Sequence, residues 1–346
     1  MKRIFITGIC GFVGSNLANY FLNLGYRVYG IDNLSRKGTE RNYKILKKKG
    51  IIIFKKDLVK LKNLKLFKKK INFQTIIHCA ALTSVLDGTN SNSTDFLYNN
   101  NFLSTLASLK LCKQTKSKFI FISSSRVYAI TDLKKLNYNI KNKLFFPKKN
   151  KLSGISDQGI NEYFPTNSPN SFYGSSKLIC EAIIQEYCKF YNIPFIINRC
   201  GLLAGSGQFY KSDQGIISFW INSWKNNKKL NYIDFGGFGY QTRDCLHPKD
   251  LCALINKQIN FLKKRNLKKF IFNVSGGISS AFSLKELSIW CEKYIFPKKV
   301  GYQQNNRPFD LKWIVLDNTA VKKLFKWKIQ LSKYKIFEEI NSNDNS

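Results

Sequence analysis

Residues 4–15 of this 346-residue chain read Ile4-Phe5-Ile6-Thr7-Gly8-Ile9-Cys10-Gly11-Phe12-Val13-Gly14-Ser15. A short apolar run meets glycines spaced Gly-x-x-Gly-x-x-Gly, which predicts a strand, a tight turn and the start of a helix. Glycine at Gly8, Gly11 and Gly14 permits the turn, the approach of the backbone to a pyrophosphate and close packing of helix on strand. Phe12 and Val13 then lie at the helix N-terminus, which adds partial positive charge. The segment therefore predicts a dinucleotide-binding site.

A carboxylate ends the second predicted strand. Asp32 lies 18 residues after Gly14, where it can accept hydrogen bonds from the adenosine ribose. A carboxylate there also repels the extra phosphate of NADP, so we expect NAD as the cofactor. Arg36 leaves NADP open, because a nearby guanidinium can accommodate that phosphate; the other interpretation is a solvated loop cation. We also assign Asn33 and Ala80 to the cofactor pocket.

Short apolar runs alternate with amphipathic segments through the first half of the chain, which is typical of βαβ units and a parallel sheet. Strands are predicted at residues 3–7, 27–31, 51–54, 75–79, 118–122 and 194–198. The expected fold class is α/β, a Rossmann-type doubly wound parallel sheet with a smaller C-terminal substrate-binding lobe. Asp57 and Leu58 follow the third strand and either contact the adenine or form a turn or helix cap.

We expect two domains. Residues 1–200 form the NAD-binding domain, with an excursion at 129–170 whose lysine-rich part, 130–156, is interpreted as loops without core. Residues 201–340 are mainly the substrate-binding lobe, with 244–275 returning to the Rossmann domain, and 341–346 form a frayed polar tail.

Composition excludes several classes of protein. With 44% hydrophobic and 14% aromatic residues, the chain is folded and not disordered. Its apolar runs are too short to span a bilayer, and glycines interrupt the run after Lys2 and Arg3 that imitates a secretory signal, so we expect the cytosol and no membrane. Nine cysteines without a Cys-x-x-Cys pair and only two histidines predict reduced thiols and no metal site.

The net charge is unusual, because 57 basic and 21 acidic residues give +36. Such a charge attracts nucleic acid or another anionic partner. The lysines are nevertheless scattered in short clusters among abundant Asn, Ile, Phe and Tyr. We therefore favour compositional bias over a nucleic-acid partner.

Tyr173 and Lys177 stand four residues apart, on one face of a helix if the segment is helical. An ammonium near a phenol lowers the phenol pKa, so that the tyrosine can take a proton from an alcohol. Ser124 follows a predicted strand, and ligands of parallel sheets bind at the carboxyl ends of strands. These three residues are the predicted catalytic set, although a surface pair and a serine-rich turn are the simpler interpretations.

Together with the glycine motif, these residues resemble the extended short-chain dehydrogenases/reductases, the nucleotide-sugar epimerase and dehydratase group, over nearly the whole chain. The resemblance implies that Ser124 is the catalytic hydroxyl, Tyr173 the acid/base, and Lys177 its partner and a ribose contact. Asn101 resembles the asparagine of the family's Asn-x-x-Gly-Thr segment and is assigned to the cofactor, with Ser104 in place of the glycine.

Two neighbours of Ser124 bear on the reaction. In this family, dehydratases and decarboxylases typically carry acidic residues directly after the catalytic Ser or Thr, whereas Ser125 and Arg126 stand here. Without those carboxylates the elimination of water lacks its acid and base, so a 4,6-dehydratase is disfavoured.

Within the family the chain most resembles the CDP-paratose 2-epimerase group. The matching stretches are residues 32–39, 213–215, 243–247 and 307–317. The resemblance implies transient oxidation of a nucleotide-diphosphate sugar to a keto-sugar, followed by reduction on the opposite face. It also implies a homodimer formed by the helix near 101–112 and the helix that starts at Tyr173.

Cations and amides of the C-terminal half are the candidate substrate contacts. Arg243 and Arg307 can hold a diphosphate, because a guanidinium matches phosphate oxygens; the alternative is a surface ion pair. The remaining candidates for the sugar or nucleotide pocket, some of which could instead cap loops, are Arg126, Gln208, Asp213 and Gln214.

Two other functions stay open. An NAD(P)H-dependent keto-sugar reductase would consume cofactor in step with product, which an epimerase does not. A basic Rossmann scaffold that binds nucleic acid would shift in a gel at physiological salt, but the set of Ser124, Tyr173 and Lys177 argues against it.

Overall fold

The computed structural model describes residues 2–61, 71–89, 93–167, 171–210, 214–262, 270–304 and 308–343. Two candidate site residues, Asp213 and Arg307, lie outside this part of the chain. The chain divides into two compact units. The first, here the Rossmann unit, comprises Met1–Ser124, Phe172–Arg199 and Leu251–Phe272; the second comprises Ser125–Ser171, Cys200–Asp250 and Asn273–Ser346.

A seven-stranded parallel sheet forms the centre of the Rossmann unit, in the order β14-β10-β5-β4-β1-β2-β3. The expected fold class is thus confirmed, and each predicted strand is present within two residues of its expected ends. The strands are β1 Arg3–Thr7, β2 Arg27–Asp32, β3 Ile52–Lys55, β4 Thr75–His78, β5 Lys118–Ser124, β10 Phe195–Cys200 and β14 Ile271–Val274.

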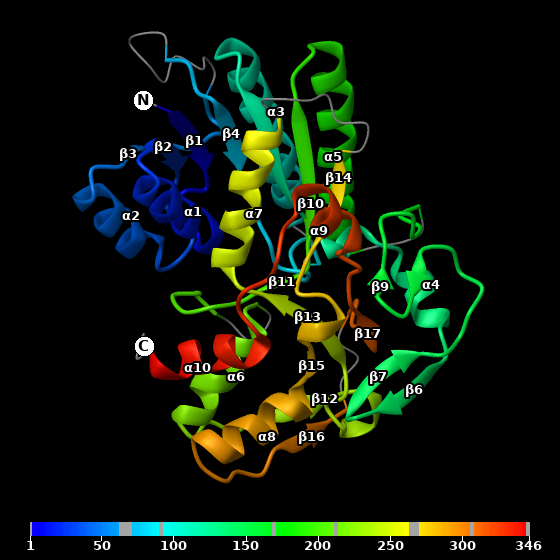
Figure 1. Ribbon diagram of the computed structural model, residues 1–346. Helices are drawn as coiled ribbons and strands as arrows, with labels where there is room; N and C mark the ends of the chain where they lie inside the picture. Colours follow the sequence, from blue (N-terminus) through cyan, green and yellow to red (C-terminus); the bar gives the residue numbers. More distant parts are fainter. Residues whose placement is uncertain are drawn as a thin grey trace. The chain divides into compact units, whose positions relative to one another are not determined.

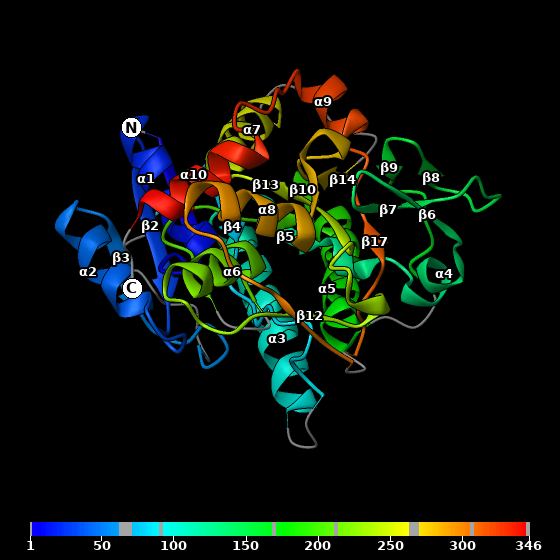
Figure 2. The ribbon, with the colours of Figure 1, turned by 90° about the horizontal axis from the view of Figure 1, so that it is seen from below.

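Helices cover both faces of this sheet (Figure 2). On one face lie α1 (Phe12–Asn23) and α7 (Pro248–Phe261), and Tyr20 of α1 lies beside Asn256 of α7. On the other face α3 (Thr94–Gln114) and α5 (Phe172–Phe190) run side by side (Figure 1), joined by a 2.6 Å hydrogen bond between Tyr98 Oη and Ser175 Oγ. Helix α2 (Thr39–Lys48) connects β2 to β3.

Apolar side chains on the α3 and α5 side of the sheet build the main core. Phe119 and Phe121 alternate along β5 and pack with Ile184 of α5 and Leu109 of α3, and all four are fully buried. Burying each of these side chains contributes about 1.5–3 kcal/mol to the free energy of folding. The cluster therefore fixes both helices on the sheet.

The second unit is built around β13 (Thr242–Leu246), which pairs with β11 (Leu202–Leu203), β15 (Ala281–Ser283) and β17 (Trp313–Ile314). Because β13 belongs to this sheet, residues 244–250 lie with the second unit and the chain returns to the Rossmann unit at Leu251. A core that includes Trp220, Trp224 and Phe337 packs the helices of this unit. Its other elements are α6 Ile216–Lys225, β12 Asn231–Ile233, α8 Leu284–Tyr294, β16 Gly301–Gln303, α9 Thr319–Phe325 and α10 Lys333–Ser342.

The excursion is more ordered than expected. Residues 130–156 contain helix α4 (Ile130–Lys135) and a hairpin of β6 (Tyr138–Lys141) and β7 (Leu144–Pro147), followed by the short pair β8 (Ile155–Ser156) and β9 (Gly159–Ile160). Leu144 and Phe145 are buried, so the expectation of loops without core was wrong. The buried pair Leu144 and Phe145 lies among exposed lysines and asparagines, so the composition of the whole segment conceals it.

The C-terminal residues 341–343 also belong to the folded part. Asn341 and Ser342 end α10, and Lys225 Nζ donates to the Asn341 carbonyl at 2.8 Å. In the described part of the chain, none of the helices combines the length and apolar character that a bilayer crossing requires.

Candidate active site

The glycine turn between β1 and α1 leaves no room for side chains. Gly8 has a φ of +64°, and a Cβ there would lie 2.8 Å from the backbone nitrogen of Ala80. A Cβ on Gly14 would lie 2.1 Å from the Gly8 carbonyl oxygen. Gly11 precedes α1 and donates to the same carbonyl at 3.1 Å. The turn therefore brings bare backbone and a helix N-terminus together, which suits a pyrophosphate.

Asp32 ends β2 beside this turn. Its Oδ2 accepts from the Cys10 amide and its Oδ1 from the Leu34 amide, both at 2.9 Å. Burial raises the pKa of this carboxyl, while the two amide bonds lower it. A carboxylate has about four acceptor sites, so Asp32 keeps lone pairs for the two ribose hydroxyls. Together with the turn, this fits a bound dinucleotide.

The other predicted cofactor residues near β2 and β3 differ in their exposure and in their partners. Asn33 is exposed and its Oδ1 accepts from the Ser35 amide, whereas Arg36 is half-buried at the turn into α2. Asp57 accepts from the Val59 amide at 3.0 Å, as a turn residue does. The side chain of Leu58 is 6% exposed in the sheet core, so only its backbone can contact an adenine.

Asn101 of α3 connects three elements of the Rossmann unit. Its Oδ1 accepts from the Leu82 amide at 2.8 Å, and its Nδ2 donates to Ser176 Oγ of α5 at 2.9 Å. The side chain is 1% exposed, so its amide is engaged inside the protein. This geometry favours a positioning role, and the cofactor contact assigned to Asn101 stays a prediction.

The predicted catalytic residues come from α5 and β5. Tyr173 and Lys177 lie one turn apart on α5, and Ser124 is the last residue of β5. All three are buried, with exposures of 7%, 3% and 8%. Lys177 Nζ donates to the Ile122 carbonyl at 3.0 Å and lies 4.6 Å from the Phe121 ring centroid. The ammonium is thus held at the end of β5 that carries Ser124.

The predicted substrate contacts that the structure describes lie in the second unit. Arg243 Nη2 pairs with Asp310 Oδ1 at 2.8 Å and also donates to the Leu311 carbonyl. Arg126 Nη1 donates to the Phe309 carbonyl at 3.3 Å. Both guanidinium groups therefore bind the same segment, 309–311.

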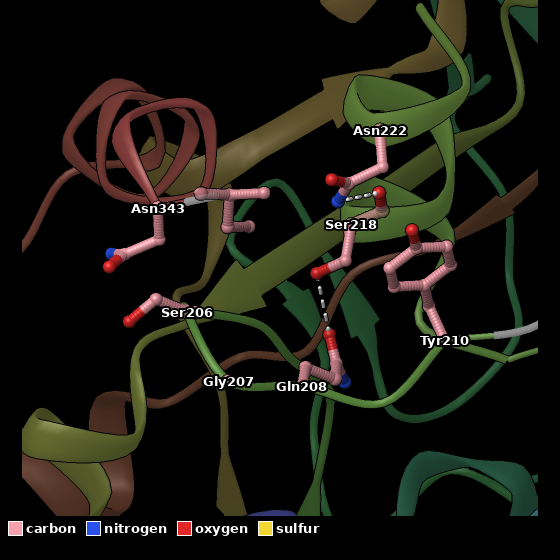
Figure 3. Close-up of a pocket in the computed structure, with 9 residues that line it drawn as sticks. Ser206, Gly207, Gln208, Tyr210, Ser218, Asn222 and Asn343 are labelled. Carbon is pink, nitrogen blue, oxygen red and sulfur yellow. Dashed lines mark hydrogen bonds between the residues drawn. The ribbon is translucent and has the colours of Figure 1, made fainter. Parts of the chain in front are cut away.

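Gln208 lies in a small polar pocket of the second unit (Figure 3). Its Oε1 accepts from Ser218 Oγ at 3.3 Å, and Nε2 donates to the Leu203 carbonyl at 2.9 Å. The pocket encloses about 20 Å³, enough for little more than a water molecule. Gln214 directly precedes Gly215, the N-cap of α6.

The sequence profile described as "NAD dependent epimerase/dehydratase family" matches residues 4–275. The chain belongs to this family. It is therefore an enzyme of a nucleotide-sugar family with NAD as its cofactor, and both predictions are confirmed.

Relatives within the family carry out different reactions. CDP-paratose 2-epimerase of Salmonella typhi is 28% identical over 298 residues, 84% of each chain. dTDP-D-glucose 4,6-dehydratase of Dictyostelium discoideum is 30% identical over 257 residues, 73% of this chain and 54% of that protein. The structure of UDP-glucuronic acid 4-epimerase from Bacillus cereus superposes with a TM-score of 0.76 at 22% identity and covers 98% of both chains, which shows a shared fold.

Some polar residues of this family member escaped the sequence analysis. His78 is fully buried, with Nδ1 2.7 Å from Thr7 Oγ1 and Nε2 3.1 Å from Thr105 Oγ1. Burial, assisted by the Lys177 ammonium, lowers the pKa of His78 to about 3, so the ring is neutral. Glu181, Arg199 and Ser123 form a second buried cluster. A carboxylate four residues after Lys177 was the signal that could have pointed to it.

The nine cysteines are unpaired and mostly buried, and burial raises the pKa of Cys188 and Cys252 to about 12. In the part of the chain that the structure describes, no three His, Cys, Asp or Glu side chains gather as a metal site would require.

Proposed function

We propose that this enzyme is an NAD-dependent epimerase of a nucleotide-diphosphate sugar, similar in activity to CDP-paratose 2-epimerase. The observation that carries the proposal is the arrangement at the end of β5. Lys177 lies one helical turn from Tyr173 on α5, and its Nζ binds the Ile122 carbonyl, two residues before Ser124 on the strand. The next two positions are Ser125 and Arg126, so the acid and base that elimination needs are missing.

The proton chemistry belongs to Tyr173. Its phenolate removes the proton from a sugar hydroxyl and later returns it, and the nearby Lys177 ammonium stabilises the phenolate. Ser124 donates a hydrogen bond to the oxygen that becomes the carbonyl. When bound, NAD would supply the acceptor and donor of the hydride that leaves the sugar carbon and returns to its opposite face. The net reaction is an isomerisation that consumes no cofactor.

Residues that would hold NAD are those of the glycine turn and Asp32. The bare backbone of the turn would hold the pyrophosphate, and the Asp32 carboxylate would accept hydrogen bonds from the ribose hydroxyls. Arg126 and Arg243 are the proposed diphosphate contacts of the sugar substrate, because planar guanidinium groups match phosphate oxygens. Arg243 already pairs with the Asp310 carboxylate, so the diphosphate would share or displace this anion.

The test uses purified protein and CDP-sugars, with product configuration followed by NMR. Tyr173→Phe should lower kcat by about 10²–10⁴-fold, the contribution of a general acid–base group. Tyr232→Phe is the matched control, because Tyr232 is equally buried and its hydroxyl donates to Ser288 Oγ in the core of the second unit. Full activity of Tyr173→Phe would overturn the assigned role.

The cofactor content separates an epimerase from a reductase. Denaturing the purified protein should release about one NAD per chain, as measured by mass spectrometry. Turnover of the sugar should leave the amount of NAD unchanged. Oxidation of added NADH or NADPH in step with product would instead establish a keto-sugar reductase.

A further inference from the structure

A buried ion pair lies directly beside the catalytic helix residues. Arg199 of β10 donates to Glu181 of α5 through Nε, 3.1 Å from Oε2, and through Nη2, 2.7 Å from the same oxygen. The two residues are 6% and 2% exposed. Removing both charges from water is costly, and a buried pair by itself is weak evidence for a stabilising role.

Glu181 has a second partner on the neighbouring strand. The Ser123 hydroxyl donates to Glu181 Oε1 at 2.5 Å, and Ser123 is 4% exposed. Ser123 directly precedes Ser124, the last residue of β5, after which the backbone turns into a 3-10 helix at Ser125. The hydroxyl is therefore bound at the point where the strand ends.

Two consecutive residues of β5 are thus held by one helix. Lys177 Nζ binds the Ile122 carbonyl and Glu181 binds the Ser123 hydroxyl, and the two α5 residues are four positions apart. The Arg199 guanidinium fixes the carboxylate from the other side, on β10. These contacts set the register of α5, and with it Tyr173, against the strand end.

We propose that Glu181, oriented by Arg199, is a positioning residue for the reaction, and that it acts through the Ser123 hydroxyl to place Ser124 relative to Tyr173. The inference rests on the proposed function, since it takes Ser124 and Tyr173 as the catalytic groups. Its physical reason is geometric: a shift of about 1 Å in a reacting group can cost about 10²-fold in rate.

Ser123→Ala tests the proposal, because it removes the link to the strand and leaves the Glu181–Arg199 pair in place. We expect kcat to fall about 10- to 100-fold, with bound NAD and the KM for the sugar little changed. Ser123→Thr keeps a hydroxyl and should restore most of kcat. Ser117→Ala is the matched control, because Ser117 is also buried and precedes the other end of β5.

Thermal unfolding of each variant separates positioning from general stability. If Ser123→Ala and Ser117→Ala lose similar stability and similar kcat, the cluster is merely structural and the proposal is wrong. Glu181→Gln adds a double-mutant cycle. Because Glu181 acts through Ser123, adding Ser123→Ala to Glu181→Gln should cause little further loss of kcat. Additive losses would show independent roles and overturn the proposal.

Tyr173→Phe, measured in parallel, keeps the two hypotheses apart. If Tyr173→Phe stays active, the proposed function fails. If it is inactive while Ser123→Ala turns over as Ser117→Ala does, only the positioning role of Glu181 fails. Should Glu181→Gln not fold, Ser123→Ala with its threonine rescue decides the question alone.

Discussion

At the scale of single residues, the predicted cofactor turn depends on glycines, which have no Cβ atom. Gly14 packs its bare Cα against the Gly8 carbonyl, and Gly8 in turn lies against the backbone of Ala80. The close approach of α1 to β1 exists only because neither position carries a Cβ. Glycine therefore contributes by leaving room for close backbone packing, whereas Asp32 contributes through the charge of its carboxylate.

Gly14→Ala should remove most of the bound NAD and destabilise the protein by about 1–3 kcal/mol, because the new Cβ overlaps the Gly8 carbonyl and must displace the turn. Released nucleotide and chemical denaturation measure both effects. Gly25→Ala is the control: its φ is +76°, so it is strained, but nothing lies within 4 Å. Retention of a full complement of NAD by Gly14→Ala would contradict the assigned site.

At the scale of elements, the β6–β7 hairpin shows how turn geometry defines a structure within a lysine-rich segment. Lys141 pairs with Leu144, so the loop has two residues, Asn142 and Lys143, with φ of +51° and +63°. Two successive left-handed residues are typical of a type I′ turn, which favours Asn-Gly. Asn142 suits the first position, whereas Lys143 is strained at the second.

Lys143→Gly should therefore stabilise the protein by about 1 kcal/mol, since a non-glycine residue in the left-handed region costs about 1–2 kcal/mol, part of which the greater freedom of glycine in the unfolded chain offsets. Urea denaturation measures the change. Lys141→Gly, inside the strand, should have the opposite sign. A loss of stability in Lys143→Gly would show that the turn is not the one described.

At the scale of the whole molecule, exposed apolar residues favour the expected homodimer, whereas the net positive charge of each chain opposes it. Phe96 and Leu103 on α3 are exposed and seven residues apart, and Phe172 and Ile179 repeat the same spacing on α5. This spacing places each pair on one face of its helix. The net charge of +36 makes two chains repel, and salt screens that repulsion.

Light scattering should accordingly give twice the chain mass of 40.0 kDa, with more dimer as salt is raised. Ile179→Glu should shift the protein toward monomer, because it places a charge in the apolar face. Ile45→Glu on α2, an equally exposed apolar position, should leave the mass unchanged. A monomer at every salt concentration would exclude the predicted dimer.

Much of the fold and cofactor site could be predicted because the signals are local. The glycine spacing, the strand ending in Asp32 and the Tyr173–Lys177 pair each occupy a few consecutive residues whose geometry follows from strand, turn or helix alone. Short buried strands of a parallel sheet are likewise apolar along their whole length. The hairpin was missed because its short apolar run lies within a longer segment rich in lysine and asparagine.

The sequence by itself thus determined the fold class, the family and the candidate catalytic groups. Only the tertiary structure decided what surrounds them: Ser123 with Glu181, 58 residues apart, and Arg243 with Asp310, 67 residues apart. No local spacing encodes such pairs, since they depend on which strand and helix the packed core brings together. For the same physical reason, Asn101 could be singled out in the sequence, but its engagement with Leu82 and Ser176 could not.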